Sequence, residues 1–162
     1  MVRLLGNSRS LISILTFLGI NISRDDGGSG SNTRRTLTDW AGDASGACRE
    51  SIPELDRNAR ALTSQPGNLE LLKETFNIKN RLHSDLRAIQ GPTNEGERGQ
   101  VDAALDKLSA SLRTIGAALA AAEAGDSAGY ESLRVEAGSS EQAGLAELAA
   151  LGAAGCGAIA GG

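Results

Sequence analysis

The sequence has 162 residues, about the length of one domain, and 40% of them are hydrophobic although only 2% are aromatic. So few aromatic residues cannot fill the pleated faces of a β-sandwich or barrel, or form a stacking surface for single-stranded nucleic acid. Residues 1–42 carry a net charge of +2 and residues 43–162 one of −6, so we expect an acidic body that does not bind nucleic acid.

The N-terminal residues have the order of features found in secretory signals. Arg3 and Arg9 precede an apolar run over residues 11–20, which is too short for a membrane-spanning helix of about 20 residues. We predict that residues 1–23 are a signal peptide or an N-terminal anchor, which would associate with a membrane through residues 11–20. The protein is then secreted or envelope-associated; a cytoplasmic protein with an apolar N-terminal extension is the alternative.

The rest of the chain divides by composition into three parts. Residues 24–42 are polar, rich in Gly and Ser and without hydrophobic periodicity, which predicts a flexible linker. Residues 43–157 are the predicted helical bundle, and residues 158–162 are the predicted tail. We interpret Trp40, just before the bundle, as a hydrophobic staple or as a plug at the end of the bundle.

The first helical pattern has apolar residues at alternating steps of four and three, which is typical of a packed helix. This stripe consists of Cys48, Ile52, Leu55, Ala59 and Leu62. Pro53 interrupts it, so either one helix continues through a kink, or a new helix starts at Ser51, which has capping-box spacing to Glu54.

The second helical pattern can begin at Asn68, a favourable N-cap, and Gly91 and Pro92 end it. Lys79 falls on or beside its apolar stripe and is expected to extend its ammonium group to solvent.

The third and fourth patterns are separated at Gly125. The third starts between Asn94 and Glu97, and it has the most regular apolar stripe: Val101, Leu105, Leu108, Leu112, Ile115 and Leu119. The fourth covers residues 126–151 and contains helix-weakening glycines, whose small size would allow a neighbouring helix to approach closely.

Four helices with short connections predict an all-α fold, an antiparallel up-down-up-down four-helix bundle; a helical hairpin that dimerises is the structural alternative. In the bundle, the start of the first helix and the end of the fourth lie at the same end, which places Cys48 near Cys156. We therefore predict a disulfide between them, as is common in exported proteins. Two separate buried thiols are the other interpretation.

Three short motifs within residues 44–157 carry a resemblance to a known type of protein. They are Ala47-Cys48-Arg49, Ala124-Gly125-Asp126, and Leu151-Gly152 followed by Cys156-Gly157. Together with the signal-like N-terminus, they make the chain resemble the small exported four-helix proteins of high-GC Gram-positive bacteria. The resemblance implies an extracytoplasmic bundle with a terminal disulfide, and it implies no activity.

The sequence offers few residues for a catalytic or metal centre. It has no Cys-x-x-Cys spacing, and its single histidine, His83, has Asn80 three residues before it where a di-iron motif requires Glu. No Gly-x-Ser-x-Gly elbow on a strand-to-helix turn supports a Ser–His–acid triad. We therefore predict no catalytic residue, no metal ligand and no cofactor.

These observations favour a non-enzymatic binding or structural module whose partner is an unidentified protein or small ligand. One alternative is a cytosolic helical protein that binds a partner or regulates it. Another is a small-ligand carrier or an enzyme with an interhelical pocket. Small residues on the third helix would leave space for such a pocket: Ala103, Ala104, Ala117, Ala118, Ala121 and Ala122.

Overall fold

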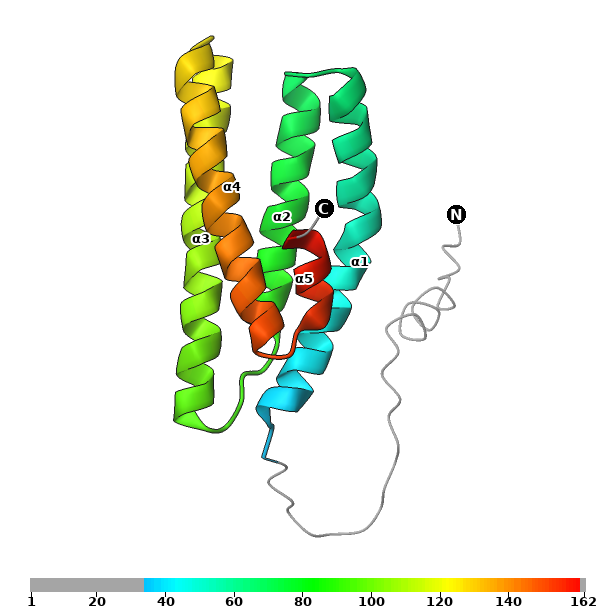
Figure 1. The fold of residues 1–162 in the computed structure, drawn as a ribbon, viewed down its shortest axis with the longest axis vertical. Helices are drawn as coiled ribbons and strands as arrows, with labels where there is room; N and C mark the ends of the chain where they lie inside the picture. The colour runs from blue at the N-terminus through cyan, green and yellow to red at the C-terminus, as the bar shows by residue number, and fades with distance from the viewer. Residues whose placement is uncertain (1–33, 161–162) are drawn as a thin grey trace, which may run out of the picture. The chain divides into compact units, whose positions relative to one another are not determined.

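A computed structural model describes residues 34–160, and their regular structure consists of α-helices (Figure 1). The predicted all-α class is therefore confirmed. The residues predicted as a signal segment, 1–23, and the linker residues 24–33 lie outside the described part of the chain. The helices are α1 (Leu37–Ser64), α2 (Leu69–Ala88), α3 (Glu95–Glu123), α4 (Ser127–Ala150) and α5 (Ala154–Ala160).

The long helices form two hairpins, α1–α2 and α3–α4, and successive long helices run in opposite directions (Figure 1). Helix α2 packs against α1 and α3, and α4 packs against α3 and α5. The short helix α5 also packs against α1, so it lies in the seam between α1 and α4.

Helix α1 begins earlier than the sequence predicted. The hydroxyl of Thr36 accepts a hydrogen bond from Asp39 N at 3.2 Å, and the Asp39 carboxylate accepts one from Thr36 N at 2.9 Å. This capping box satisfies free N–H groups at the helix start. The linker prediction is therefore wrong for residues 37–42, and Trp40, in the second turn, is fully buried as a plug.

One continuous helix includes Pro53, which settles the choice left open by the sequence. The predicted cap at Ser51 is wrong, because its hydroxyl donates to the Ala47 carbonyl at 3.3 Å within the helix. The predicted N-cap of α2, Asn68, is confirmed, and the predicted starts of the third and fourth patterns agree with the structure, where Asn94 and Asp126 are the N-caps of α3 and α4.

Helix α5 was not predicted, because residues near the C-terminus were expected to form a cap and a frayed tail. Gly152, with a φ of +102°, allows the chain to turn sharply from α4 into α5. The Ser45 hydroxyl of α1 accepts a hydrogen bond from Gly155 N at 2.8 Å, so it caps α5 from a different helix. The tail prediction is therefore wrong for residues 158–160.

The apolar core lies at the end of the molecule that holds α5. Trp40, Leu86, Leu148 and both cysteines are fully buried there. Packing becomes looser along α3, where Val101, Leu105 and Leu108 are buried but Leu112, Ile115 and Leu119 are only partly covered. The bundle is therefore closed at one end and more open at the other.

Two helical glycines have opposite surroundings, which gives a matched pair of substitutions. A Cβ atom at Gly155 would overlap the backbone oxygen and hydroxyl of Ser45, whereas one at Gly138 would meet nothing within 4 Å. We expect Gly155→Ala to lower the free energy of unfolding by about 1–3 kcal/mol through overpacking. Gly138→Ala should raise it by up to about 1 kcal/mol through helix propensity. Urea unfolding measures both changes, and a stabilising Gly155→Ala would contradict the close contact between α1 and α5.

Candidate functional site

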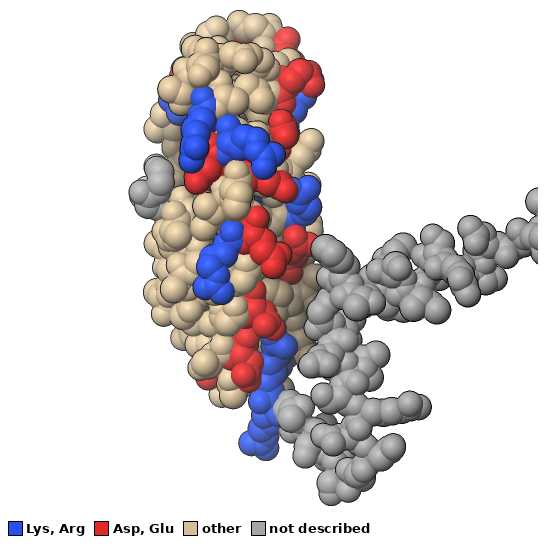
Figure 2. All heavy atoms as spheres, turned by 90° about the vertical axis from the view of Figure 1, so that its right-hand side faces the viewer, with Lys and Arg blue, Asp and Glu red and all other residues tan. Residues whose placement is uncertain are grey.

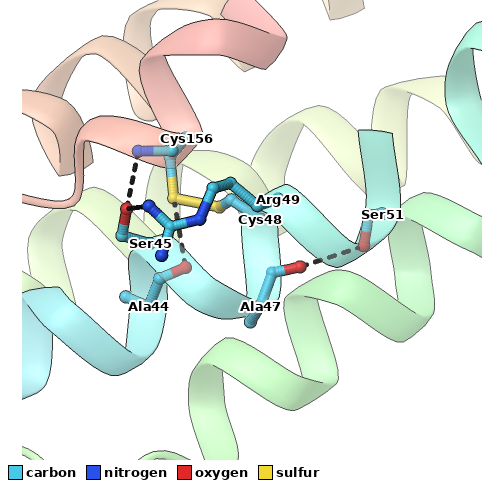
Figure 3. Close-up of a disulfide and its surroundings, with 8 residues drawn as sticks. Ala44, Ser45, Ala47, Cys48, Arg49, Ser51 and Cys156 are labelled. Atoms are coloured by element: carbon cyan, nitrogen blue, oxygen red, sulfur yellow. Dashed lines mark hydrogen bonds between the residues drawn. A yellow bond between two sulfur atoms is a disulfide. The ribbon is translucent and has the colours of Figure 1, made fainter. Parts of the chain in front are cut away.

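The predicted partners Cys48 and Cys156 come together and form a disulfide between α1 and α5 (Figure 3). Their Cα atoms lie 5.0 Å apart, and both side chains are fully buried. The predicted pairing is therefore confirmed, and the part of the chain that the structure describes has no free thiol to act as a nucleophile.

Ser45 adds a polar contact beside the disulfide (Figure 3). Its hydroxyl accepts hydrogen bonds from Gly155 N at 2.8 Å and from Arg49 Nη1 at 3.1 Å. A helix of seven residues is not stable alone in water, so α5 depends on these contacts with α1. The disulfide end is thus a structural staple that positions α5.

Beyond the end of α5, the seam between α1 and α4 is an open cleft of about 490 Å³. We call it the inter-hairpin cleft, because α1 and α2 form one side and α4 and α5 the other. Its lining is mainly aliphatic: Ile52, Leu55, Ala59 and Leu62 of α1, Leu145 of α4, and Ala158, Ile159 and Ala160 of α5.

The cleft changes the interpretation of the first apolar stripe. Of its five residues, only Cys48 is buried, and the other four line the cleft. Ile52, Leu55 and Leu62 are partly exposed, and Ala59 is exposed. The stripe is therefore only partly packed beyond Cys48, because that part of it lies along the cleft.

Two neighbouring hollows share lining residues with the cleft. One of about 240 Å³ lies between α2, α3 and α4, and one of about 620 Å³ lies between the α1–α2 turn and the α3–α4 turn. Phe76 and Tyr130, two of the few aromatic residues, line them. Open apolar surface therefore continues from α5 towards the tips of both hairpins.

A polar pair crosses the floor of the cleft. Lys79 Nζ of α2 donates to Glu141 Oε2 of α4 at 2.5 Å, and both side chains are mostly buried. Both residues line the cleft, the 240 Å³ hollow and a small hollow of about 20 Å³ below them. The prediction that Lys79 extends to solvent is therefore wrong, because a carboxylate on the facing helix pairs with it.

Few of the α3 alanines that were proposed to leave space for a pocket line these hollows. Ala118 and Ala122 line the two neighbouring hollows, whereas Ala104 is packed in the core and Ala103 and Ala117 face solvent. The inter-hairpin cleft instead lies between the α1–α2 hairpin and the helices α4 and α5. The sequence signal that could have located it is the long apolar stripe of α1, combined with the glycine-containing face of α4.

His83 is half-buried and shares a hydrogen bond of 2.8 Å with the hydroxyl of Ser109. Burial is the main reason that the pKa of His83 lies below its ordinary value, and the nearby Arg87 adds to the effect. Ser109 lies in the middle of α3 and also contacts the Leu105 carbonyl at 3.1 Å. The backbone N–H groups around it belong to the helix, so the pair has the geometry of a polar packing contact.

Residues 125–129 have the letters Gly-Asp-Ser-Ala-Gly, which match the spacing of a nucleophile elbow. Gly125 and Asp126 lie between α3 and α4, residues 127–129 are the first residues of α4, and Asp126 caps this helix by accepting a hydrogen bond from Gly129 N at 2.9 Å. A nucleophile elbow requires a strand before the turn and a histidine beside the serine. The histidine of the described chain, His83, hydrogen bonds to Ser109 and not to Ser127. Ser127 is therefore simply the first residue of α4.

Other kinds of site receive no support from residues 34–160. No group of three or more His, Cys, Asp or Glu residues there could hold a metal ion. In that range, no helix has both the length and the apolar character needed to cross a membrane. Figure 2 shows basic side chains interleaved with acidic ones on one face of the bundle, an arrangement unlike the continuous basic surface of a phosphate-binding protein.

No protein-family model, curated protein or solved structure matches this chain. Functional conclusions therefore depend on the geometry of the cleft and of the disulfide.

Reduction of the disulfide tests how far the fold depends on it. The bond closes a loop of 108 residues, so its loss should lower the free energy of unfolding by about 4 kcal/mol in the chain-entropy model. Urea unfolding of oxidised and reduced protein compares the same sequence in two states. Amide hydrogens of α5 should also exchange faster after reduction. Equal stability and equal exchange would contradict a structural role for the bond.

Proposed function

We propose that the protein is an extracytoplasmic, non-enzymatic binding module, and that it binds apolar side chains of a partner in the inter-hairpin cleft. The scaffold in this proposal is an antiparallel up-down-up-down four-helix bundle, with α5 as a wedge at its closed end.

The partly exposed apolar stripe of α1 carries the proposal. Ile52, Leu55 and Leu62 have the spacing of a helix face that packs against another helix, yet they line a cleft. Contiguous apolar surface of this kind costs free energy in water and marks a surface that binds a partner. Leu145 and Ile159 on the opposite wall extend the same apolar surface.

Helix α5 indicates what shape of partner fits. It occupies the same seam between α1 and α4 that the cleft continues, and it does so as a helix with mainly small residues. An apolar helical segment in line with α5 would contact both walls, which is the helix-in-groove mode of recognition. The Lys79–Glu141 pair offers hydrogen-bonding groups at the floor.

A small-ligand carrier is the second candidate function. A cleft of about 490 Å³ falls in the usual range for ligand sites, which is about 300–1,000 Å³. The lining has no aromatic side chain, so this candidate takes an aliphatic ligand.

The disulfide supports the extracytoplasmic setting, because such bonds persist in oxidising compartments and are rare in the cytosol. The predicted signal segment and the resemblance to exported bundles favour the same setting. Mass spectrometry of protein from its native host tests it. We expect a mature N-terminus near residue 24, after the predicted signal segment of residues 1–23, and a bridged Cys48–Cys156 pair. An intact Met1 together with two free thiols would contradict export.

Binding of an apolar fluorescent probe, 1-anilinonaphthalene-8-sulfonate, to dilute folded protein tests the cleft. We expect one site, and we expect Leu55→Asp to weaken it by about tenfold or more, because the substitution places a charge on the apolar wall.

Ala120→Asp is the matched control, because Ala120 is exposed on α3 and is not among the residues that line the cleft. Circular dichroism should show that both variants keep their helices. Equal probe binding by the two variants, or no binding by the wild type, would overturn the assignment of the cleft as the binding surface.

A further inference from the structure

We propose that the disulfide between α1 and α5 is a redox switch for the inter-hairpin cleft. Reduction of Cys48–Cys156 by a dithiol releases α5 from α1, and the cleft then extends along the whole seam between α1 and α4. This inference rests on the proposed function, because the site that the switch regulates is the same cleft.

Helix α5 is the element that joins α1 to α4. Within residues 34–160, the long helices pack in chain order, α1 on α2, α2 on α3 and α3 on α4, whereas α5 packs on both α1 and α4. Figure 1 shows α5 in red between α4 and α1. The α1–α4 side of the bundle is therefore closed by a helix of seven residues, and its release leaves the packing of the long helices on one another in place.

Contacts that do not involve the disulfide hold α5 beside α4. A Cβ atom at Gly157 would lie 3.1 Å from Ala149 Cβ, so the two helices approach closely there. The Gln142 amide donates a hydrogen bond to the Ala160 carbonyl at 3.3 Å, at the end of α5. Because the chain also passes directly from α4 into α5, we expect α5 to stay with α4 when the disulfide is reduced.

On the α1 side, the covalent bond is the main attachment of α5 (Figure 3). Beside it, Gly155 N donates one hydrogen bond to the Ser45 hydroxyl at 2.8 Å. Apart from Cys156 and Ile159, α5 consists of Gly and Ala, which bury little apolar surface. A helix this short also has little stability of its own. Loss of the covalent bond therefore leaves α5 weakly held to α1.

The apolar walls of the cleft continue into the part of the seam that α5 closes. Leu145 of α4 lines the cleft, and Leu148, three residues further along α4, is fully buried in the apolar cluster that contains Cys156. On α1, Ala44 lies one turn before Cys48 and is also fully buried in this cluster. Release of α5 therefore adds residues of the same apolar faces to the cleft.

The chemical step is a thiol–disulfide exchange. One thiolate of the dithiol attacks a sulfur of the protein disulfide and forms a mixed disulfide, and the second thiol then displaces the protein sulfur. The protein gains two electrons and two protons as two thiols, and the dithiol becomes a disulfide. Both cysteines are fully buried, so the exchange requires a transient opening at this end of the molecule.

The reactivity of the reduced cysteines tests the release of α5 on the full chain in native buffer. After reduction by dithiothreitol and anaerobic removal of the reagent, iodoacetamide should alkylate both thiols at a rate within about tenfold of that in urea-unfolded protein. Thiols that stay docked would react at least about a hundredfold more slowly. The rate should also be insensitive to dilute urea, because local opening exposes little surface. Mass spectrometry counts the alkylated thiols.

A pair of serine substitutions tests the opening that precedes reduction. Ser45→Ala removes the hydrogen bond to Gly155 N and should speed reduction of the folded oxidised protein by about fivefold. Ser139→Ala, at an exposed position of α4 outside the cleft lining, should leave the reduction rate unchanged. Circular dichroism should show that reduced protein keeps its long helices. Loss of those helices on reduction, or thiols that stay protected, would overturn the proposal.

Probe binding distinguishes failure of this inference from failure of the proposed function. Reduced and alkylated protein should bind about twice as much 1-anilinonaphthalene-8-sulfonate per chain as oxidised protein, because its apolar cleft is longer. Oxidised protein that binds the probe, with no gain on reduction, would overturn the switch and leave the cleft as a binding surface. Oxidised protein that binds no probe would overturn the proposed function, whatever the reactivity of the thiols.

Discussion

The attachment of α5 to α1 is the constraint on which the rest of the structure depends. Cys48 and Cys156 join the two helices covalently, and Ser45 caps α5 through Gly155 N. The seven-residue helix has little stability of its own, so these contacts hold it in place. Because α5 then separates α1 from α4, it closes one half of their seam and leaves the other half open. The same staple therefore accounts for both the compact end and the cleft.

The low aromatic content explains why a covalent link is useful here. Trp40 is fully buried at the closed end, whereas Phe76 and Tyr130 are only partly covered and line the open hollows. A core made mainly of Leu and Ala packs closely, but each alanine buries little apolar surface. A bond that closes a long loop stabilises the fold by restricting the unfolded chain. Packing at the other end can therefore stay loose without loss of the fold.

Local sequence was sufficient to predict the four long helices and the cysteine pairing. Asn68 was a recognisable cap, the starts of α3 and α4 were predicted near their caps Asn94 and Asp126, and the order of helices placed both cysteines at one end. Helix α5 could not be predicted in this way, since its N-terminus is capped by Ser45 from a distant part of the chain. The cleft was missed for a related reason: periodicity shows which face of a helix is apolar, but it does not show whether another element covers that face.

The stripes of α1 and α3 illustrate this limit, because they have the same alternating steps but neighbouring helices bury them to different extents. Leu105 and Leu108 of α3 meet facing helices, whereas Ile52 and Leu55 of α1 face the gap that α5 leaves. The Lys79–Glu141 pair lies between these regions and links α2 to α4. Replacing one member of a mostly buried ion pair destabilises the fold, because the charge of the other member would stay buried without a partner. The pair therefore holds α2 and α4 at a set separation, and the cleft lies between the apolar residues on either side of it.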